Sequence, residues 1–273
     1  MKLGLIGETL GHSLSPAIHR HIFRVLGLSG TYDLVEIPRE DLARRVRLLF
    51  SDMDGFNVTI PYKTAVIPHL AGLSDEAAAI GAVNTVAVRD GKGYGYNTDY
   101  TGFSRTVDAI GADPAGRTAV VLGTGGASRA VIQCLRDRGA ARLLAVSRRP
   151  DAVDGGFRAF AAARDAELIS YEALEAGPGG FLLVNATPCG MFPRAGVSPV
   201  TAETARKFPK VIDLIYNPRE TELLRRAREG GADTANGLVM LAAQGAAAEE
   251  IWLGRALPKD CIDGVVRELE ALL

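Results

Sequence analysis

The sequence contains few of the residues that build disulfide or metal sites. The cysteines and histidines are Cys134, Cys189, Cys261, His12, His19, His21 and His69. The cysteines are scattered and odd in number, and they form no C-x-x-C pair, so neither a disulfide framework nor a zinc site is indicated. The histidines show no metal-ligand spacing either. We therefore expect no bound metal.

An excess of charge and long apolar runs are also lacking. The chain has 31 Lys and Arg residues against 32 Asp and Glu, for a net charge of −1. This balance does not indicate a nucleic acid or a membrane surface as partner. No segment approaches the roughly 20 apolar residues of a transmembrane helix, and the apolar run at the N-terminus is too short for a signal peptide. We expect a cytoplasmic globular protein whose 273 residues form two domains.

A short apolar run, a glycine turn and a helix follow one another in the middle of the chain. Ala119–Leu122 shows no polar alternation, which is typical of a parallel strand covered on both faces. The turn reads GTGGAS, in which Gly123 permits a sharp bend, and Gly125 and Gly126 let the backbone approach a pyrophosphate. Ser128 stands where the dinucleotide-binding pattern has its third glycine. The alternative is a strand-to-helix turn without a ligand.

The end of the next strand favours NADP over NAD. The helix stops near Gly139, and the apolar run that follows ends in Ser147, Arg148 and Arg149. An NAD site usually has Asp or Glu at this position to bind the ribose 2′-hydroxyl, whereas guanidinium groups suit a 2′-phosphate. The alternative is a solvated arginine pair in a loop.

Strands and helices alternate from about residue 118 to 235, which predicts a parallel sheet with right-handed crossovers. One of these strands, residues 181–184, ends in Asn185, Ala186, Thr187 and Pro188. Polar residues at the carboxyl end of a strand lie where ligands bind in open α/β sheets. The fold class predicted for the chain is therefore α/β.

Two serines mark the start of the first helix. Pro16 suits the first helical position, which makes Ser15 the expected N-cap of a helix that runs to about Leu26. This explanation leaves Ser13 unexplained. Two hydroxyls close to the N–H groups of a helix start favour an anion such as a carboxylate. A structural role and a binding role both stay open at this point.

One lysine stands out in a chain that has only six lysines among its 31 basic residues. The strand that ends at Pro61 carries polar Asn57 and Thr59 on one face, and Lys63 follows on a helical turn. Lysine can release a proton once it is desolvated, whereas arginine cannot, so a step that needs proton transfer requires lysine. The alternative is a solvated lysine at a helix end.

A hairpin predicted from Asp90-Gly91 carries two further polar groups. Asn84 lies on its first strand, and Asp99 follows its second strand. Asp99 is expected either to cap the helix 100–110 or to lie beside Lys63, where the two side chains have the chemistry for proton transfer to a hydroxyl or carbonyl. Gln244 lies on a long Ala-rich helix and is either solvated or a donor and acceptor for a ligand.

These segments together resemble the shikimate dehydrogenase family over nearly the full length and in collinear order. The motifs that carry the resemblance are Gly11-His-Ser13-Leu-Ser15-Pro, Asn57-Val-Thr59-Ile-Pro-Tyr-Lys63, Gly81-Ala-Val-Asn84-Thr, Asn97-Thr-Asp99, Gly123-Thr-Gly-Gly-Ala-Ser-Arg129 and Asn236-Gly-Leu-Val-Met-Leu-Ala-Ala-Gln244. The chain departs from the family pattern at Tyr100, Thr124, Ser128 and Ser147, where the family commonly has Gly, Ala, Ala and Asn.

The resemblance implies a role for each matching residue. Lys63 and Asp99 correspond to the catalytic pair, and Thr59, Asn84 and Gln244 to the residues that hold the ring hydroxyls of the substrate. Ser13 and Ser15, together with Tyr216, correspond to the residues that bind its carboxylate. The residues expected to bind NADP are Gly123, Thr124, Gly125, Gly126, Ala127, Ser128, Ser147, Arg148, Arg149, Thr187 and Gly237.

The resemblance also implies the architecture and the reaction. An α/β substrate-binding domain is expected from residues 1–103 and 237–273, a Rossmann-type NADP-binding domain from residues 104–236, and a cleft between them. The expected reaction is the reversible, NADPH-dependent reduction of 3-dehydroshikimate to shikimate by a cytoplasmic monomer or homodimer. Two alternatives stay open, namely a quinate/shikimate dehydrogenase that uses either NAD or NADP, and a non-catalytic NADP-binding sensor.

Overall fold

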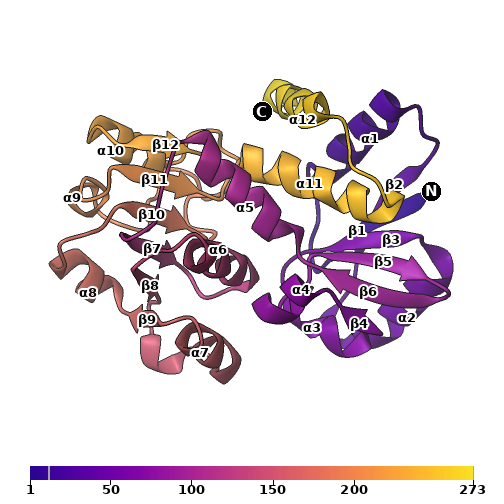
Figure 1. Ribbon diagram of the computed structural model, residues 1–273, viewed down its shortest axis with the longest axis horizontal. Helices are drawn as coiled ribbons and strands as arrows, with labels where there is room; N and C mark the ends of the chain where they lie inside the picture. The colour runs from indigo at the N-terminus through magenta and orange to yellow at the C-terminus, as the bar shows by residue number, and fades with distance from the viewer. Residues whose placement is uncertain (12, 273) are drawn as a thin grey trace. The chain divides into compact units, whose positions relative to one another are not determined.

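The computed structural model describes residues 1–11 and 13–272 and divides into two compact units. Unit 1 comprises Met1–Gly102 and Leu241–Leu272, and unit 2 comprises Phe103–Met240. Helices α5 (Thr98–Ala109) and α11 (Leu238–Leu253) each begin in one unit and end in the other (Figure 1). His12, which belongs to one of the motifs named above, lies outside the described residues. The predicted α/β class is confirmed.

Unit 1 contains a mixed six-stranded sheet with the order β2-β1-β3-β5-β6-β4. Its strands are β1 (Lys2–Gly7), β2 (Thr31–Glu36), β3 (Gly55–Val58), β4 (Gly72–Leu73), β5 (Thr85–Arg89) and β6 (Lys92–Tyr96). Strand β1 pairs in parallel with β2 and β3, whereas β5 is antiparallel to β3 and β6. The β5–β6 hairpin turns at Asp90 and Gly91, both with positive φ, as the dipeptide predicts.

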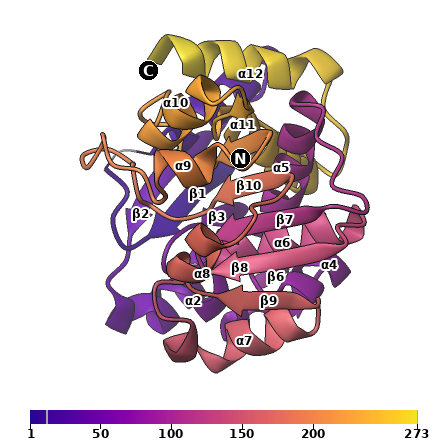
Figure 2. The same cartoon turned by 90° about the vertical axis from the view of Figure 1, so that its left-hand side faces the viewer.

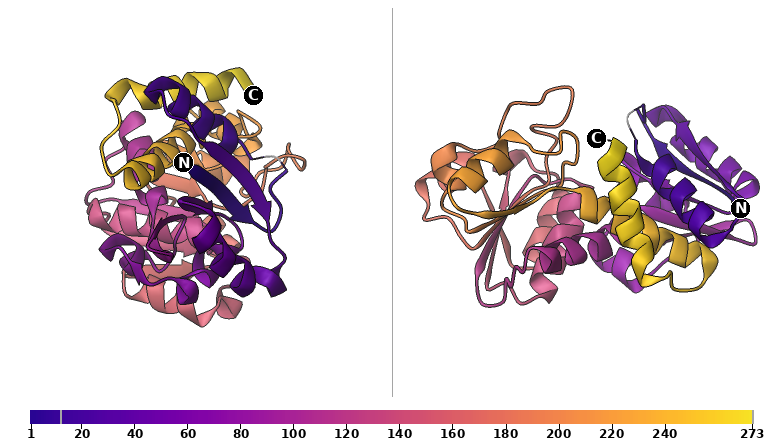
Figure 3. Two further views of the ribbon diagram at one scale, coloured as in Figure 1. Left: turned by 90° about the vertical axis from the view of Figure 1, so that its right-hand side faces the viewer. Right: turned by 90° about the horizontal axis from the view of Figure 1, so that it is seen from above.

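The helices of unit 1 bury one face each against this sheet or against one another. They are α1 (Ser15–Leu26), α2 (Leu42–Asp52), α3 (Tyr62–Ala65), α4 (Asp75–Ile80) and α12 (Lys259–Leu272), with 3-10 turns at Arg39–Asp41 and Ile67–His69. Side chains at helical spacing, such as Val46 and Leu49 of α2, join Phe56 of β3 in the core. Helix α12 lies alongside α1 (Figure 3), and Glu268 forms a hydrogen bond with His21 and an ion pair with Arg24 there.

Unit 2 contains the predicted parallel sheet, with the order β12-β11-β10-β7-β8-β9. Its strands are β7 (Thr118–Leu122), β8 (Arg142–Val146), β9 (Ala166–Ile169), β10 (Leu182–Asn185), β11 (Lys210–Asp213) and β12 (Asp233–Ala235). Every neighbouring pair is parallel, and Figure 2 shows β7, β8 and β9 side by side. Counted along the chain, this is the doubly wound order 3-2-1-4-5-6 that binds dinucleotides where the strand order reverses.

The helices of unit 2 follow its strands in alternation. They are α6 (Gly126–Asp137), α7 (Gly155–Ala162), α8 (Tyr171–Ala176), α9 (Ala202–Ala205) and α10 (Glu222–Glu229), with a 3-10 turn at Pro150–Ala152. The central strand β7 is buried from Ala119 to Leu122, as its unbroken apolar run predicts. Helix α6 ends where predicted, because Gly139 takes φ +79 and donates its N–H to the Arg136 carbonyl at 2.9 Å.

Two helix starts differ from the expectation, and both differences concern proposed site residues. Leu14 already has helical dihedrals and is the N-cap of α1, so Ser15 is the first helical residue and its side chain does not cap the helix. Helix α5 begins at Thr98, and the Asn97 side chain accepts the N–H of Tyr100 at 3.4 Å. Asp99 therefore lies inside the first turn and does not cap α5.

Candidate functional site

Lys63 and Asp99 form an ion pair in unit 1. The Lys63 Nζ lies 2.5 Å from Asp99 Oδ2, and the two side chains are only 15% and 7% exposed. Lys63 is on α3, which follows β3 after the turn at Pro61, and Asp99 is in the first turn of α5. Thirty-six residues of sequence separate the pair. The fold therefore selects, for Asp99, the placement beside Lys63 over the capping role.

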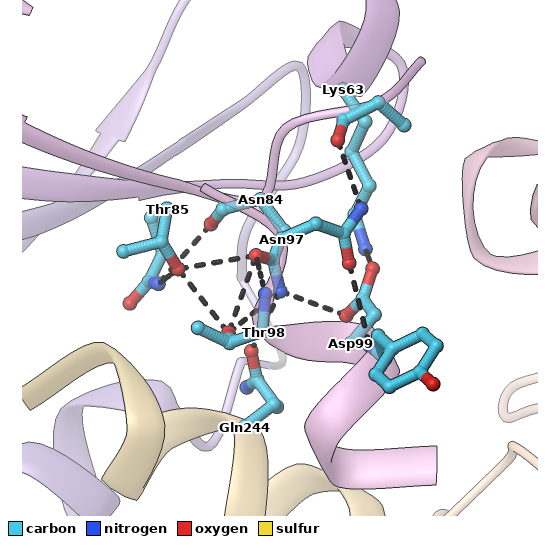
Figure 4. A network of polar contacts seen from close by, with 10 residues as sticks. Lys63, Asn84, Thr85, Asn97, Thr98, Asp99 and Gln244 are labelled. Carbon is cyan, nitrogen blue, oxygen red and sulfur yellow. Dashed lines mark hydrogen bonds and ion pairs between the residues drawn. The ribbon is translucent and has the colours of Figure 1, made fainter. Parts of the chain in front are cut away.

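Asn84 links this pair to Gln244 (Figure 4). Its Nδ2 is 2.9 Å from Asp99 Oδ1 and 3.2 Å from Gln244 Oε1. Its Oδ1 accepts the backbone N–H of Thr98 at 2.7 Å, which fixes the orientation of the amide because only an oxygen can accept that hydrogen. Four of the residues predicted from the sequence thus lie in one connected cluster.

Further buried polar groups, which the sequence analysis did not select as site residues, support this cluster from behind. Thr98 Oγ1 lies 3.0 Å from Asn84 Nδ2, and Thr85 Oγ1 lies 3.1 Å from Asn84 Oδ1. Asn57 donates to Thr85 Oγ1 at 3.0 Å and accepts from the hydroxyl of Tyr32 at 2.7 Å. These four residues, Thr98, Thr85, Asn57 and Tyr32, are each less than 9% exposed. The sequence feature that could have identified these residues is the pair of Asn-Thr dipeptides, at 84–85 and 97–98, at the two ends of one hairpin.

This network fixes the Asp99 carboxylate beside the Lys63 ammonium. Both Asp99 oxygens are engaged, one by Lys63 and the other by Asn84, so the carboxylate cannot rotate without losing a hydrogen bond. An ammonium has three hydrogens, and Asp99 takes one of them. The arrangement can therefore hold a proton donor in a fixed position beside a carboxylate, which is what general acid and base catalysis requires.

Thr59 follows β3 and donates its N–H to the Ile6 carbonyl of β1 at 2.9 Å, whereas Ser13 and Ser15 lie at the start of α1. Ser15 is 8% exposed, and the Ser13 hydroxyl accepts its backbone N–H at 3.2 Å. Among the described residues no hydrogen bond joins these three side chains directly to Lys63 or Asp99. Ser15 forms a side-chain hydrogen bond with Tyr32, whose hydroxyl donates to Asn57 Oδ1 at 2.7 Å. Burial raises the pKa of Tyr32 well above its usual value, and the hydrogen bond with Ser15 opposes that rise.

The glycine turn of unit 2 packs at Gly123 against Thr187, which follows the end of β10. Gly123 has φ +103, and a Cβ there would lie 3.0 Å from Cγ2 of Thr187. Strands β7 and β10, which lead into these two residues, are neighbours in the sheet at the point where the strand order reverses. Gly125 is the N-cap of α6 without a side-chain cap, and nothing lies within 4 Å of where its Cβ would be.

Thr187 is held by the strands beside it. Its N–H and its hydroxyl both donate to Asn185 Oδ1, at 3.0 and 2.7 Å. Asn185 in turn donates to Asp213 Oδ1 at 2.9 Å, and the Thr221 hydroxyl donates to Asp213 Oδ2 at 2.7 Å. Burial raises the pKa of Asp213 to about 6, although three hydrogen bonds, from Thr221, Ile215 and Asn185, oppose the shift.

The segment after β8 carries the arginines predicted to select NADP. Ser147 accepts the N–H of Arg149 at 3.2 Å. Arg148 and Arg149 are exposed, and neither forms an ion pair with a described residue. Within the same region Ser128 is fully buried and its hydroxyl has no hydrogen-bond partner among the described residues. Thr124 and Ala127, the other members of the turn, are partly exposed.

Tyr216 and Gly237 both belong to unit 2. A Cβ on Gly237 would lie 2.1 Å from the carbonyl oxygen of Leu214, so only glycine fits there. This packing explains the glycine without a cofactor, and the expected cofactor role of Gly237 stays a prediction. Tyr216 is partly buried, and its part in binding the substrate carboxylate likewise stays a prediction.

The described residues contain no group of three or more metal-ligating side chains that could hold an ion, and their cysteines form no disulfide. Within residues 1–11 and 13–272, no helix combines the length and apolar character needed to cross a bilayer.

Comparison with known proteins agrees with this geometry. Residues 5–86 match the model of the shikimate dehydrogenase substrate binding domain, and residues 237–267 match that of the shikimate 5′-dehydrogenase C-terminal domain. A protein of Clostridium perfringens (strain SM101 / Type A) named shikimate dehydrogenase (NADP(+)) is 41% identical over 274 residues, which cover 99% of each chain. The chain belongs to the shikimate dehydrogenase family.

Solved structures of family members share the whole fold. A chorismate mutase/shikimate 5-dehydrogenase fusion protein from Clostridium acetobutylicum has a TM-score of 0.92 at 41% identity, covering 99% of this chain and 97% of that one. The shikimate 5-dehydrogenase of Thermus thermophilus, solved in complex with NADP(H) and shikimate, has a TM-score of 0.87 at 35% identity and full coverage of both chains. Membership of the family inferred from the sequence motifs is thus confirmed.

Proposed function

We propose that the chain catalyses the reversible reduction of 3-dehydroshikimate to shikimate with NADPH. The observation that carries this proposal is the buried Lys63–Asp99 ion pair, which Asn84 ties to Gln244. The chain has this pair within a sequence 41% identical to a protein named shikimate dehydrogenase (NADP(+)). Substrate binding is assigned to unit 1 and cofactor binding to unit 2.

Lys63 is the proton donor in the direction of reduction. Reduction of a ketone to an alcohol adds a hydride to carbon and a proton to oxygen, and bound NADPH supplies the hydride. Lys63 Nζ gives its proton to the carbonyl oxygen and takes it back from the hydroxyl in the reverse reaction. Asp99 keeps the ammonium in place through the 2.5 Å contact and accepts a hydrogen bond from a neighbouring substrate hydroxyl.

Polar side chains of unit 1 hold the substrate. Asn84 and Gln244 offer both donors and acceptors, and with Thr59 they are assigned to the ring hydroxyls. Ser13 and Ser15 are assigned to the carboxylate, and Tyr216 of unit 2 keeps the same assignment from the family resemblance alone. The finding that Ser15 does not cap α1 supports this role, because its hydroxyl is not committed to a backbone N–H of the helix.

The residues of unit 2 fit a dinucleotide that carries a 2′-phosphate. The open space at Gly125 lets a pyrophosphate approach the backbone at the start of α6. Arg148 and Arg149 offer guanidinium donors that no described carboxylate occupies. The residues assigned to NADP are Gly123, Thr124, Gly125, Gly126, Ala127, Ser128, Ser147, Arg148, Arg149, Thr187 and Gly237.

Neither alternative is favoured. A non-catalytic sensor has no use for a lysine and a carboxylate placed 2.5 Å apart within a polar network. Against dual cofactor use, Arg148 and Arg149 stand where NAD enzymes place an acidic residue, which favours NADP over NAD. A cytoplasmic location and a monomeric or homodimeric state complete the proposal.

The test compares two lysines of unit 1. The Lys63→Met variant should lower kcat for shikimate oxidation by about 10²–10⁴-fold, the usual contribution of general acid and base catalysis, and leave the Kd for NADP⁺ unchanged. Lys92, which is exposed at the start of β6, provides the matched control, and Lys92→Met should keep kcat. Absorbance in the NADPH band measures turnover, with shikimate against quinate and NADP⁺ against NAD⁺.

Two outcomes contradict different parts of the proposal. Near wild-type kcat in Lys63→Met would reject the assignment of proton transfer to Lys63. A wild-type enzyme that turns over quinate and NAD⁺ as well as shikimate and NADP⁺ would instead support the dual-cofactor alternative.

A further inference from the structure

Arg129, on the first turn of α6, has a half-buried guanidinium that no acidic side chain neutralises. The guanidinium makes no hydrogen bond or ion pair with a described residue, although several neighbouring arginines do. Burial lowers the pKa of Arg129, and the negative charge of Asp154 opposes this only in part. A half-buried guanidinium without an ion-pair partner carries a desolvation cost, which the charge of Asp154 offsets only in part.

The guanidinium is held in place by apolar and aromatic contacts. Its Cζ lies 4.9 Å from the ring centre of Phe160 and 5.4 Å from that of Phe157. These contacts stabilise a planar cation on the rings and leave its N–H donors at the edge unengaged. Asp154 Oδ1 accepts the N–H of Phe157 at 2.9 Å as the cap of α7, and within the described part of the chain Asp154 forms no ion pair with Arg129.

Its location connects Arg129 with the segment predicted to select NADP. A Cβ on Gly156 would lie 3.6 Å from Arg129 Nη2, which places the guanidinium at the beginning of α7. The eight residues from Ser147 to Asp154, with Arg148 and Arg149 near their start, connect β8 to α7. In a doubly wound sheet the 2′ position of the adenosine ribose is recognised at the end of this second strand.

We propose that Arg129 is a further determinant of cofactor specificity, and that its guanidinium binds the 2′-phosphate of NADP. This inference rests on the proposed function of unit 2. A phosphate monoester matches the two parallel N–H donors of a guanidinium, and such charge-assisted bonds are about twice as strong as neutral ones. NAD lacks that phosphate and leaves Arg129 without a partner. The rings of Phe157 and Phe160 position Arg129 before the cofactor arrives.

The experiment compares Arg129→Met with Arg164→Met. Arg164 is a matched control because it lies over the same ring, 4.0 Å from the centre of Phe160, and burial lowers its pKa too. Its donors are already used, however, by Gln133 Oε1 at 2.5 Å and the Phe160 carbonyl at 3.3 Å. Methionine replaces most of the apolar stem in both variants. Binding of NADP⁺, NAD⁺, 2′,5′-ADP and 5′-AMP to the full-length variants is measured by calorimetry.

Arg129→Met should weaken NADP⁺ and 2′,5′-ADP by about 10- to 100-fold, the range for a hydrogen bond between charged groups. NAD⁺ and 5′-AMP should change by less than about twofold, since they lack the phosphate. Arg164→Met should leave the ratio of NADP⁺ to NAD⁺ affinity as in the wild type. Arg129→Lys keeps the charge without the planar fork and should give an intermediate ratio.

Equal weakening of NADP⁺ and NAD⁺ in Arg129→Met, or an unchanged ratio, would overturn the inference and leave Arg129 with a packing role. A wild-type protein that binds NAD⁺ as tightly as NADP⁺ would overturn the cofactor assignment itself. The two failures are therefore distinguishable. If Arg129→Met does not fold, the ratio measured for Arg129→Lys decides in the same way.

Discussion

The buried carboxylate of Asp213 should make the stability of this protein depend on pH. The pKa of Asp213 is raised from its usual 3.8 to about 6, chiefly by burial, and the side chain is fully buried at the end of β11. The folded state therefore holds the proton more tightly than the unfolded state. The free energy of unfolding therefore has its full contribution from protonated Asp213 below about pH 4, and this contribution is lost as the pH rises from 4 through 6.

The Asp213→Asn variant removes this titration and can keep the hydrogen bonds. An asparagine Oδ1 can accept from Asn185 and Ile215, as Asp213 Oδ1 does at 2.9 and 3.1 Å. Its Nδ2 can donate to Thr221 Oγ1, whose hydroxyl proton then turns away. The variant thus resembles the protonated wild type at every pH.

The expected gain in stability follows from the shift. The pKa of Asp213 rises by about two units, so ionisation of this carboxyl destabilises the folded state by about 3 kcal/mol, at about 1.4 kcal/mol per pKa unit. Roughly half of this penalty is present at pH 5 and nearly all of it at pH 7.5. The free energy of unfolding of Asp213→Asn minus that of the wild type should therefore increase by about 1–2 kcal/mol between these pH values.

Urea unfolding of both proteins at several pH values between 5 and 8 measures this difference. Asp151→Asn, at an exposed position of the same unit, is the control and should stay within about 0.5 kcal/mol of the wild type throughout. A difference for Asp213→Asn that is independent of pH, or that shrinks as the pH rises, would refute the argument from burial.

Two further predictions concern packing in unit 2. Ser128→Ala removes a buried hydroxyl that has no partner among the described residues and should raise the free energy of unfolding by about 1 kcal/mol. Ser170→Ala removes the cap that accepts the N–H of Ala173 and should lower the free energy of unfolding by a similar amount. A lower stability of Ser128→Ala in denaturant unfolding would contradict the prediction for Ser128. Gly237→Ala forces a Cβ to within 2.1 Å of the Leu214 carbonyl oxygen and should lower the free energy of unfolding by about 3 kcal/mol, the upper end of the usual cost of overpacking. Gly155→Ala, where nothing lies within 4 Å, is its control in thermal melts, and equal melting temperatures for the two variants would contradict the steric argument.

Local patterns in the sequence determined the elements of this protein. Unbroken apolar runs such as Ala119–Leu122 predicted buried parallel strands, because a strand covered on both faces has no polar side. Asp90-Gly91 predicted the hairpin, because both residues tolerate positive φ. The same kind of reasoning identified Gly139 as the end of α6. These predictions depend on a few neighbouring residues and needed no knowledge of the rest of the chain.

Local sequence patterns also indicated the candidate site residues but left open whether each has a structural or a functional role. Lys63, Asp99 and Gln244 each had a plausible structural role when considered alone. The residue types offered the pairing of Lys63 with Asp99 as one alternative, and only the resemblance to a known family added Asn84 and Gln244 to it. Their association depends on contacts between residues up to 160 positions apart, as between Asn84 and Gln244. No local periodicity encodes such contacts, because they follow from the order of the strands in the sheet.

Tertiary structure alone decided which groups are satisfied and which are not. Asn97 accepts a backbone N–H at the start of α5, so Asp99 does not cap this helix and its carboxylate is available to pair with Lys63. Arg129 and Arg164 are both arginines over the same ring, yet only Arg164 has its donors occupied. The physical reason is that burial and hydrogen bonding depend on what the folded chain brings to each side chain, and a linear sequence does not contain that information in any short window.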